Sequence, residues 1–262
     1  MPTHNSTEPN NRASTMLYSL RNLIGKRIHA LDDDFGACKD FLFDEQSYRI
    51  RYIVVRTGSW LPGRKVIISP ASVVPLDESD LANGIPVNMD REAIENSPPI
   101  EPDEPISRKI ESRLHEHYGW IPYWIAEPAG AFNALAGPGM PHIETSAKLR
   151  HRNPLTADPL LQSARGIRGY SIRPADKKST GPLEDLLVDS DSWTLKYAIV
   201  DTKAWFVGGL RVIPFASTKY IDHQETEIGV SLTAKGIKDS PPPPSKREPV
   251  PRKDADALSQ KD

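Results

Sequence analysis

The chain has 262 residues, of which 38% are hydrophobic and 26% are charged, and its formal net charge is −2. This near-neutral balance creates no field that would draw the chain to DNA or to an anionic membrane. Cys38 is the one cysteine, which excludes an internal disulfide and is typical of the reducing cytoplasm. The N-terminus lacks a signal-peptide pattern, and no apolar run approaches the ~18 residues of a membrane span. We therefore expect a soluble, cytoplasmic protein without membrane insertion or DNA binding.

One sequence unit occurs twice in the chain. Residues 36–72 align with residues 181–217 at a constant offset of 145. Identical residues occupy thirteen positions of this alignment: Gly36/Gly181, Asp40/Asp185, Leu42/Leu187, Asp44/Asp189, Ser47/Ser192, Tyr52/Tyr197, Val55/Val200, Thr57/Thr202, Trp60/Trp205, Gly63/Gly208, Ile68/Ile213, Ala71/Ala216 and Ser72/Ser217. A repeat of this length indicates two copies of a domain, because solenoid units have only ~20–50 residues.

The hydrophobic pattern predicts short strands in both copies. In copy one, alternation and apolar runs predict strands at 23–30, 39–44, 49–55, 64–68 and 86–89, and then a short helix capped by Asp90. Copy two repeats this order, with strands at 169–172, 182–189, 194–201, 210–216 and 228–232 and a helical stretch around 235–238. Short strands with turns every 8–12 residues are typical of a small barrel or sandwich.

The remaining segments divide the chain into five parts. Residues 1–15 are polar and predicted to be disordered, and the proline-rich, charged tail at 241–262 is predicted to be disordered too. Residues 16–99 and 160–240 are the two predicted domains. The linker at 100–159 is rich in proline and aromatic residues and is predicted to contain one helix near 104–118. The signals for that helix are the cap Asp103, the terminating Gly119, and an apolar stripe of Ile106, Ile110, Leu114 and Tyr118.

Several motifs of both copies resemble the PRC-barrel domain, a small β-barrel named for the cytoplasmic domain of the photosynthetic reaction centre H subunit. The motifs in copy one are Gly25-x-x-Ile28, Gly36-x-x-x-Asp40-Phe41-Leu42-Phe43-Asp44, Tyr52-Ile53-Val54-Val55 and Val66-Ile67-Ile68-Ser69-Pro70. Copy two carries Gly169-x-x-Ile172, Gly181-x-x-x-Asp185-Leu186-Leu187-Val188-Asp189 and Tyr197-Ala198-Ile199-Val200. The segment 118–124 looks like a linker of tandem PRC-barrel proteins in bacteria. The resemblance implies a mainly β fold with two small antiparallel PRC-type barrels joined by the helix-containing linker.

The resemblance also implies a function of contact with other macromolecules. The leading hypothesis is a non-catalytic adaptor or scaffold that binds another protein of unknown identity. The second hypothesis is a component on the cytoplasmic side of a photosynthetic reaction-centre or electron-transfer complex, peripherally associated with a membrane complex, although this chain lacks the membrane helix of the H subunit. The third is an enzyme with a hidden hydrolytic site, and the fourth is a ribosome- or RNA-associated factor.

No catalytic, cofactor-binding or metal-binding residue is assigned from the sequence. Paired aspartates occur in both copies and are expected to serve turns and strand ends, because no His or Lys stands at catalytic spacing; they are Asp40, Asp44, Asp185 and Asp189. His115 and His117 diverge on a helix and are expected to lie at a solvated helix end. Gly208-Gly209 is interpreted as a loop and Cys38 as a partly buried residue.

Aromatic side chains supply the candidate interface. Trp60 and Trp205 occupy the same loop in the two copies, and each is either a lid over its barrel or a recognition residue. The candidate interface also includes the aromatic cluster of the linker: Tyr118, Trp120, Tyr123 and Trp124. This cluster is either internal packing that fixes the two barrels relative to each other or a docking site for a partner.

Overall fold

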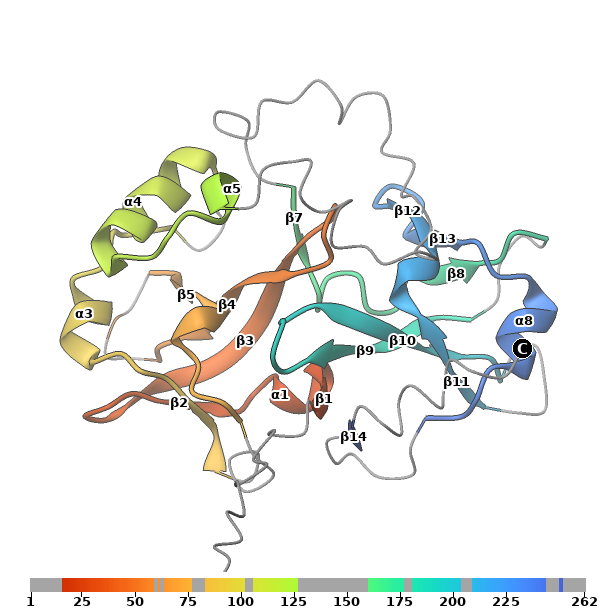
Figure 1. Ribbon diagram of the computed structural model, residues 1–262, viewed down its shortest axis with the longest axis horizontal. Helices are drawn as coiled ribbons and strands as arrows, with labels where there is room; N and C mark the ends of the chain where they lie inside the picture. Colours follow the sequence, from red (N-terminus) through yellow and green to blue (C-terminus); the bar gives the residue numbers. More distant parts are fainter. Residues whose placement is uncertain are drawn as a thin grey trace, which may run out of the picture.

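The computed structural model describes residues 16–58, 61, 64–76, 83–101, 106–126, 160–176, 181–203, 209–243 and 250–251. The protein is mainly β (Figure 1). Copy one contains β2 (Arg27–His29), β3 (Asp34–Asp44), β4 (Ile50–Arg56), β5 (Val66–Ile68), the 3-10 turn η1 (Pro70–Ser72), β6 (Ile85–Pro86) and α3 (Arg91–Glu95). Copy two contains β8 (Ser171–Arg173), β9 (Leu183–Asp189), β10 (Leu195–Asp201), β11 (Leu210–Pro214), η2 (Phe215–Ser217), β12 (Thr218–Asp222), β13 (Glu227–Val230) and α8 (Ala234–Asp239).

The other elements precede or follow the copies. Short segments lead into each copy: β1 (Met16–Ser19) with α1 (Leu20–Leu23) before copy one, and β7 (Leu161–Ser163) before copy two. Two helices follow copy one, α4 (Arg108–Tyr118) and α5 (Tyr123–Ala126), whereas the linker was expected to contain one helix. A two-residue strand, β14 (Val250–Pro251), pairs with β1. The tail at 241–262 was expected to be disordered throughout, but these two of its residues form a strand.

The described strands form three sheets. Their orders are β5-β4-β3-β2-β6 with β7 also on β3, β11-β10-β9-β1-β14, and β12-β13-β8. Within the described part of the chain, none of these orders closes into a barrel. In copy one the turn η1 begins at Pro70 and interrupts the sheet after β5. Among the residues described there, an isolated bridge from Val73 to Val87 is the one pairing that continues toward β6. The pairs β2–β6 and β8–β13 are parallel, whereas fully antiparallel sheets were expected.

The repeat glycines illustrate why the two copies take the same local path. A Cβ on Gly36 would collide with the carbonyl oxygen of Arg56, and a Cβ on Gly181 would collide with that of Asp201. Both glycines therefore allow the neighbouring strand to approach at equivalent places.

The two copies share one hydrophobic core. Phe43 meets Phe215 edge-on at 6.0 Å between ring centroids, Tyr48 meets Phe215 at 4.8 Å, and Phe41 stacks on Trp193 at 6.3 Å. These rings belong to a single cluster that draws residues from both copies. The linker was expected to fix the copies relative to each other. The two copies are instead joined directly, because these large rings from both copies are buried against one another.

The copies also exchange their leading segments. β1, which precedes copy one, pairs with β9 of copy two, and β7, which precedes copy two, pairs with β3 of copy one (Figure 1). The hydroxyl of Ser19 donates to Asp185, and the hydroxyl of Ser163 donates to Asp40, each over 2.5 Å. Because these serines are 144 residues apart and the aspartates 145, the two contacts are equivalent, which gives the fold an approximate internal two-fold symmetry.

The tips of two hairpins meet at the centre of this symmetry. Tyr48 and Trp193 are equivalent residues with positive φ, 56° and 51°. The backbone N–H of Ile50 donates to the carbonyl of Trp193 over 2.7 Å, and the N–H of Leu195 donates to the carbonyl of Tyr48 over 2.9 Å. These reciprocal bonds hold the β3–β4 turn against the β9–β10 turn.

Candidate functional site

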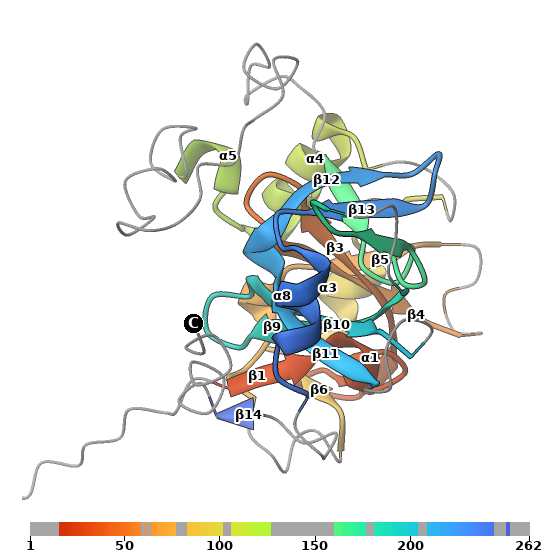
Figure 2. The ribbon, with the colours of Figure 1, turned by 90° about the vertical axis from the view of Figure 1, so that its right-hand side faces the viewer.

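Helix α4 covers the outer face of the copy-one sheet. Its Ile110 and Leu114 pack in a second cluster with Tyr52, Val54 and Ile67 from β4 and β5. Figure 1 shows the helix beside this sheet, and both ribbon views place it far from β14 (Figure 2). Burial of one apolar stripe is therefore one of the contacts that hold α4 on copy one.

The ends of α4 follow local capping chemistry. Ser107 caps the N-terminus by accepting a bond from the N–H of Ile110, so the helix starts later than the expected cap at Asp103. Asp103 itself lies outside the described residues. Gly119 ends the helix in the left-handed conformation with φ 66°, which confirms the predicted terminus.

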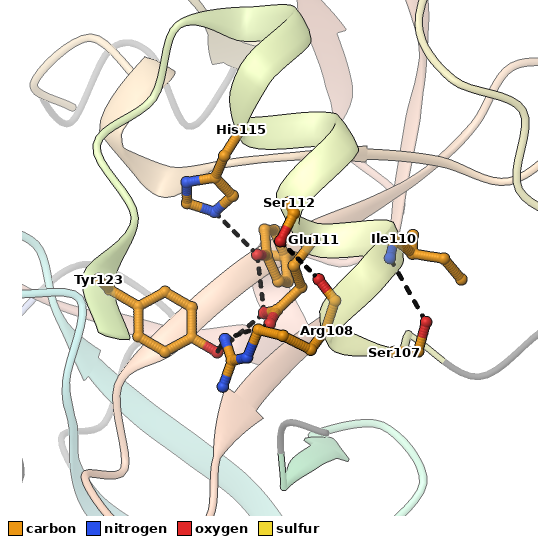
Figure 3. A network of polar contacts seen from close by, with 8 residues as sticks. Ser107, Arg108, Ile110, Glu111, Ser112, His115 and Tyr123 are labelled. Carbon is orange, nitrogen blue, oxygen red and sulfur yellow. Dashed lines mark hydrogen bonds and ion pairs between the residues drawn. The ribbon is translucent and has the colours of Figure 1, made fainter. Parts of the chain in front are cut away.

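A buried polar network lies under α4 (Figure 3). Glu111 is completely buried, and its Oε1 accepts hydrogen bonds from the hydroxyls of Tyr52 and Tyr123, each over 2.8 Å. Its Oε2 pairs with the guanidinium of Arg108. A buried carboxylate is tolerated when it is paired and hydrogen-bonded in this way.

Burial sets the protonation chemistry of the network. Burial raises the pKa of Glu111, and Arg108 and the two tyrosine hydroxyls oppose that rise. Burial also raises the pKa of Tyr52 and of Tyr123, with the Glu111 carboxylate acting in the same direction. Both phenols therefore stay protonated and can donate to Glu111.

His115 extends this network toward the surface. Its side chain is 6% exposed, and its Nε2 lies 3.0 Å from the hydroxyl oxygen of Tyr52. Burial lowers the pKa of His115, while the backbone of Trp120 and Ile121 acts in the opposite direction. The other ring nitrogen, Nδ1, is buried and has no hydrogen-bond partner of good geometry among the described residues. The expectation that His115 lies at a solvated helix end is wrong, because the residue shares the buried face of Glu111, one turn earlier.

Aromatic side chains surround the imidazole. The rings of Trp124 and Trp120 lie 4.8 and 5.6 Å from that of His115 between centroids. The guanidinium of Arg108 lies over Trp124 at 4.1 Å, and that of Arg51 lies over Tyr123 at 3.8 Å. These contacts combine cation–π attraction with the packing of long side chains on rings.

Four of the six candidate interface residues lie within the described part of the chain. Trp124 is buried, whereas Tyr118, Trp120 and Tyr123 are half-buried. Tyr118 and Trp120 stack on each other at 4.3 Å. Tyr118 and Trp120 also pack against the copy-one cluster that contains Tyr52, as the internal-packing alternative expects. The remaining two candidates, Trp60 and Trp205, lie outside the described residues.

An open hollow of about 330 Å³ lies between α4 and the segment that follows it. Its lining is Ser112, His115, Glu116, Trp120, Pro122 and Trp124. Beside it, Ile121 is 79% exposed, a large value for an aliphatic side chain in an aromatic segment. We call the hollow and Ile121 together the α4 surface.

Only part of this site could be predicted from the sequence. The pattern indicated the aromatic residues and the apolar stripe, but it did not indicate the buried polar residues Tyr52, Arg108 and Glu111. One signal existed: Arg108 and Glu111 are three residues apart, and Glu111 and His115 four apart, so all three can share one helix face.

The repeated aspartates accept backbone hydrogen bonds, as predicted. Asp44 accepts from the N–H of Ser47 over 2.7 Å, and Asp189 accepts from the N–H of Ser192 over 2.8 Å. Asp40 and Asp185 were expected to serve local turns and strand ends. That expectation is wrong for these two, because Asp40 lies inside β3 and Asp185 inside β9. Each accepts from the N–H of the next residue in its strand, and each also ties its copy to the leading segment of the other copy.

The histidine and cysteine candidates that remain lie apart from the α4 surface. His117 is exposed, and its Nε2 lies 2.8 Å from the carbonyl oxygen of Ala93. Cys38 is buried. Among the residues that the structure describes, no three His, Cys, Asp or Glu side chains are placed to hold a metal ion.

Comparison with protein-family models and with curated proteins finds no match for this chain. No helix within the described ranges is long and apolar enough to cross a membrane.

Proposed function

We propose that this protein is a non-catalytic adaptor that binds another protein through the α4 surface, on a scaffold of two PRC-type barrel units. The resemblance of the repeat motifs to PRC-barrel domains supports the scaffold. The observation that carries the binding role is Ile121, which is 79% exposed next to the aromatic hollow. Exposed aliphatic and aromatic groups around a pocket are typical of the centre of a protein interface.

The geometry also explains why this surface is suited to binding. The network of Glu111, Arg108 and Tyr52 holds α4 in one position, so the rim of the hollow is already formed before a partner arrives. A preformed surface avoids the ordering entropy that reduces affinity.

The test compares two exposed aliphatic side chains. Ile121→Ser removes the apolar tip of the α4 surface, and Leu31→Ser makes the same kind of change at a turn of copy one, where Leu31 is 68% exposed. Tagged full-length proteins are purified from the native cell, and co-eluting proteins are quantified by mass spectrometry. The partner captured by the wild type is then titrated against all three proteins. We expect Ile121→Ser to lower its affinity about 10-fold, as for loss of ~1.5 kcal/mol of apolar burial, with Leu31→Ser unchanged. Equal binding by both variants would contradict the proposal.

A second candidate, association with RNA, is favoured by a basic hollow of about 190 Å³ at the end of β4. The basic side chains in its lining are Lys39, Arg56, Arg64 and Lys65. At the positions of Lys39 and Arg56, copy two carries Glu184 and Asp201, so this charge belongs to copy one alone. If RNA binds here, a single-stranded RNA should bind with a strong salt dependence, and Lys39→Glu combined with Arg56→Glu should abolish that binding. Unchanged binding by the double variant would exclude this hollow.

A further inference from the structure

The hollow at the end of β4 has basic side chains and no acidic side chain in its described lining. The basic residues are Lys39, Arg56, Arg64 and Lys65, and the hollow has a volume of about 190 Å³. The other described residues of the lining are apolar or neutral. Positive potential is therefore concentrated at one place, because no lining carboxylate offsets it.

A β-bulge sets the position of Lys39. The register of β3 against β4 shifts between Cys38 and Asp40, so Lys39 is the extra residue of the bulge. A bulge redirects a side chain away from the regular alternation of the strand. Lys39 is exposed, and Arg56, the last residue of β4, is exposed too. Two adjacent strands thus bring an ammonium and a guanidinium to the same hollow.

Hydrogen bonds to carbonyl groups order the rest of the lining. The guanidinium of Arg64 donates to the carbonyl of Glu95 over 3.0 Å and also to the carbonyl of Ser97. Neutral carbonyls orient the guanidinium without cancelling its charge. The hydroxyl of Thr57 donates to the carbonyl of Leu61 over 3.1 Å, which ties Leu61 to the end of β4. These contacts fix parts of the lining before a ligand arrives, which lowers the entropy cost of binding.

The equivalent positions of copy two carry the opposite charge. Lys39 and Arg56 correspond to Glu184 and Asp201 at the offset of 145 residues. The bulge is repeated, because Glu184 is the extra residue where β9 shifts its register against β10. Glu184 and Asp201 each form an ion pair with a basic side chain, whereas no ion pair joins Lys39 or Arg56 to a carboxylate within the described ranges. The same local fold therefore accepts acidic residues here, and the β-structure does not require the basic residues of copy one.

The chemistry of this lining favours a single phosphate group over a strand of nucleic acid. A phosphate monoester carries a charge of about −1.5 to −2 at pH 7 and has three strong acceptor oxygens. Guanidinium groups match such oxygens with pairs of N–H donors. Proteins that hold single-stranded nucleic acid use a groove in which aromatic side chains stack on the bases. The described lining of this hollow contains no aromatic side chain.

We propose that this hollow binds a terminal phosphate group, in the form of a phosphate monoester. Lys39 and Arg56 donate to the phosphate oxygens, and Arg64 adds positive charge from the wall. The same group occurs on phosphorylated side chains and on small phosphorylated molecules, and these two sources are separated by the probes used. The site has no lining residue in common with the hollow of the α4 surface and does not depend on the adaptor function. RNA, the second candidate for this hollow, offers phosphodiesters and is the competing outcome.

The experiment titrates full-length protein with two monoesters, acetyl-phosphoserine amide and adenosine 5′-monophosphate, in phosphate-free buffer of about 0.15 M ionic strength. Acetyl-glutamate amide controls for an ordinary carboxylate, and a single-stranded RNA without a terminal phosphate controls for diesters. NMR of the backbone amides of Lys39 and Gly58 locates the binding.

We expect both monoesters to shift these two signals, and the tighter of the two identifies the carrier of the phosphate. Acetyl-phosphoserine amide should bind at least about fivefold more tightly than acetyl-glutamate amide. Equal binding of these two probes, or shifts confined to other amides, would overturn the proposal. Shifts caused by the RNA and by neither monoester would also overturn it and would leave the hollow to RNA.

A matched pair of double variants tests the location. Lys39→Glu with Arg56→Asp gives the hollow the charges of copy two, and we expect at least about tenfold weaker binding of the monoesters, because two attractive charges become repulsive. Lys219→Glu with Lys235→Glu changes the net charge equally at exposed positions of copy two and should alter the affinity by less than about twofold. Equal losses in the two variants would show that net charge attracts the probes, and the site would be wrong. The test of Ile121→Ser concerns the α4 surface alone, so either proposal can fail without the other.

Discussion

The outer faces of the two sheets carry equivalent apolar residues in different settings. The equivalent pairs are Leu42/Leu187, Tyr52/Tyr197, Val54/Ile199, Ile67/Val212 and Leu161/Leu17, and each set forms its own cluster. On copy one, α4 adds Ile110 and Leu114 to this face. On copy two, no described helix joins the corresponding cluster. The repeat therefore supplies the same platform twice, and the described helix that is added to it lies on one copy.

The equivalent tyrosines Tyr52 and Tyr197 show how the presence of α4 changes the setting of a repeated residue. The hydroxyl of Tyr52 is buried between Glu111 and His115, whereas Tyr197 is half-buried. A residue that is identical in both copies thus becomes part of a polar network under α4 in copy one. The difference arises from α4 and not from the repeat itself.

The strongest way to break this asymmetry is to remove Glu111. Glu111→Ala takes the carboxylate away from Arg108 and from two tyrosine hydroxyls. We expect a loss of about 3–5 kcal/mol in the free energy of unfolding of the part that includes α4, measured by urea denaturation with tryptophan fluorescence. The control, Glu116→Ala on the exposed side of α4, should change it by less than about 0.5 kcal/mol. Similar losses in the two variants would show that the network does not hold α4.

The part of the fold that could be predicted from sequence is the part encoded locally. The offset of 145 residues predicted the repeated strand order, and Asp90 and Gly119 were correctly assigned as a helix cap and a helix end. Such signals depend on neighbouring residues. The buried Glu111 was not predicted, because a stripe analysis counts apolar positions and cannot see a carboxylate that gains partners only on folding.

The exchange of leading segments could not be predicted for a different reason. Which strand β1 joins is a long-range choice, and the alignment of 36–72 with 181–217 starts after both leading segments. A weak signal was present, since Ser19-x-Arg21 recurs as Ser163-x-Arg165 at an offset of 144. Only the structure shows that these serines bind the aspartate of the opposite copy.

The serine–aspartate contacts that are equivalent in the two copies can be tested at Asp185 and Asp40. Asp185 is buried and accepts from the hydroxyl of Ser19 and from two backbone N–H groups, including that of Arg21. Asp40 makes the equivalent contacts but is half-buried. We expect Asp185→Ala to lower the free energy of unfolding by about 2–3 kcal/mol, and Asp40→Ala by about 1–2 kcal/mol. Chemical denaturation measures both, with Glu225→Ala, in an exposed turn, as the control. Losses no larger than in that control would mean that the exchanged segments do not stabilise the fold.

A smaller effect is expected where the two outer faces differ directly. Tyr52→Phe removes a donor to Glu111 and the contact with Nε2 of His115, so the protein should lose about 1–2 kcal/mol of unfolding free energy. Tyr197→Phe makes the same change at the equivalent position of copy two, where we expect a loss of less than about 1 kcal/mol. Denaturation of both variants under the same conditions gives the comparison. An equal loss in the two would show that α4 does not set the role of the tyrosine.

The smallest expected change in unfolding free energy concerns residues of the parallel strand pairs, His29 on β2 and Arg173 on β8. In copy one, His29 on β2 contacts the backbone oxygen of Asn83 and the carboxylate of Asp34, and the backbone contact is the main cause that raises the pKa of His29 above 6.5. In copy two, the equivalent residue is Arg173, which pairs with Glu227.

A raised pKa in the folded state means that the protonated imidazole stabilises the fold below pH 6.5, and this stabilisation is lost as the pH rises through the folded pKa. The difference in unfolding free energy between wild type and His29→Gln should therefore be larger at about pH 5 than at about pH 8. The same difference for Arg173→Gln should not change over this range, because arginine stays charged. A His29→Gln effect that is independent of pH would mean that the imidazole stabilises copy one through packing or a neutral hydrogen bond and not through its charge.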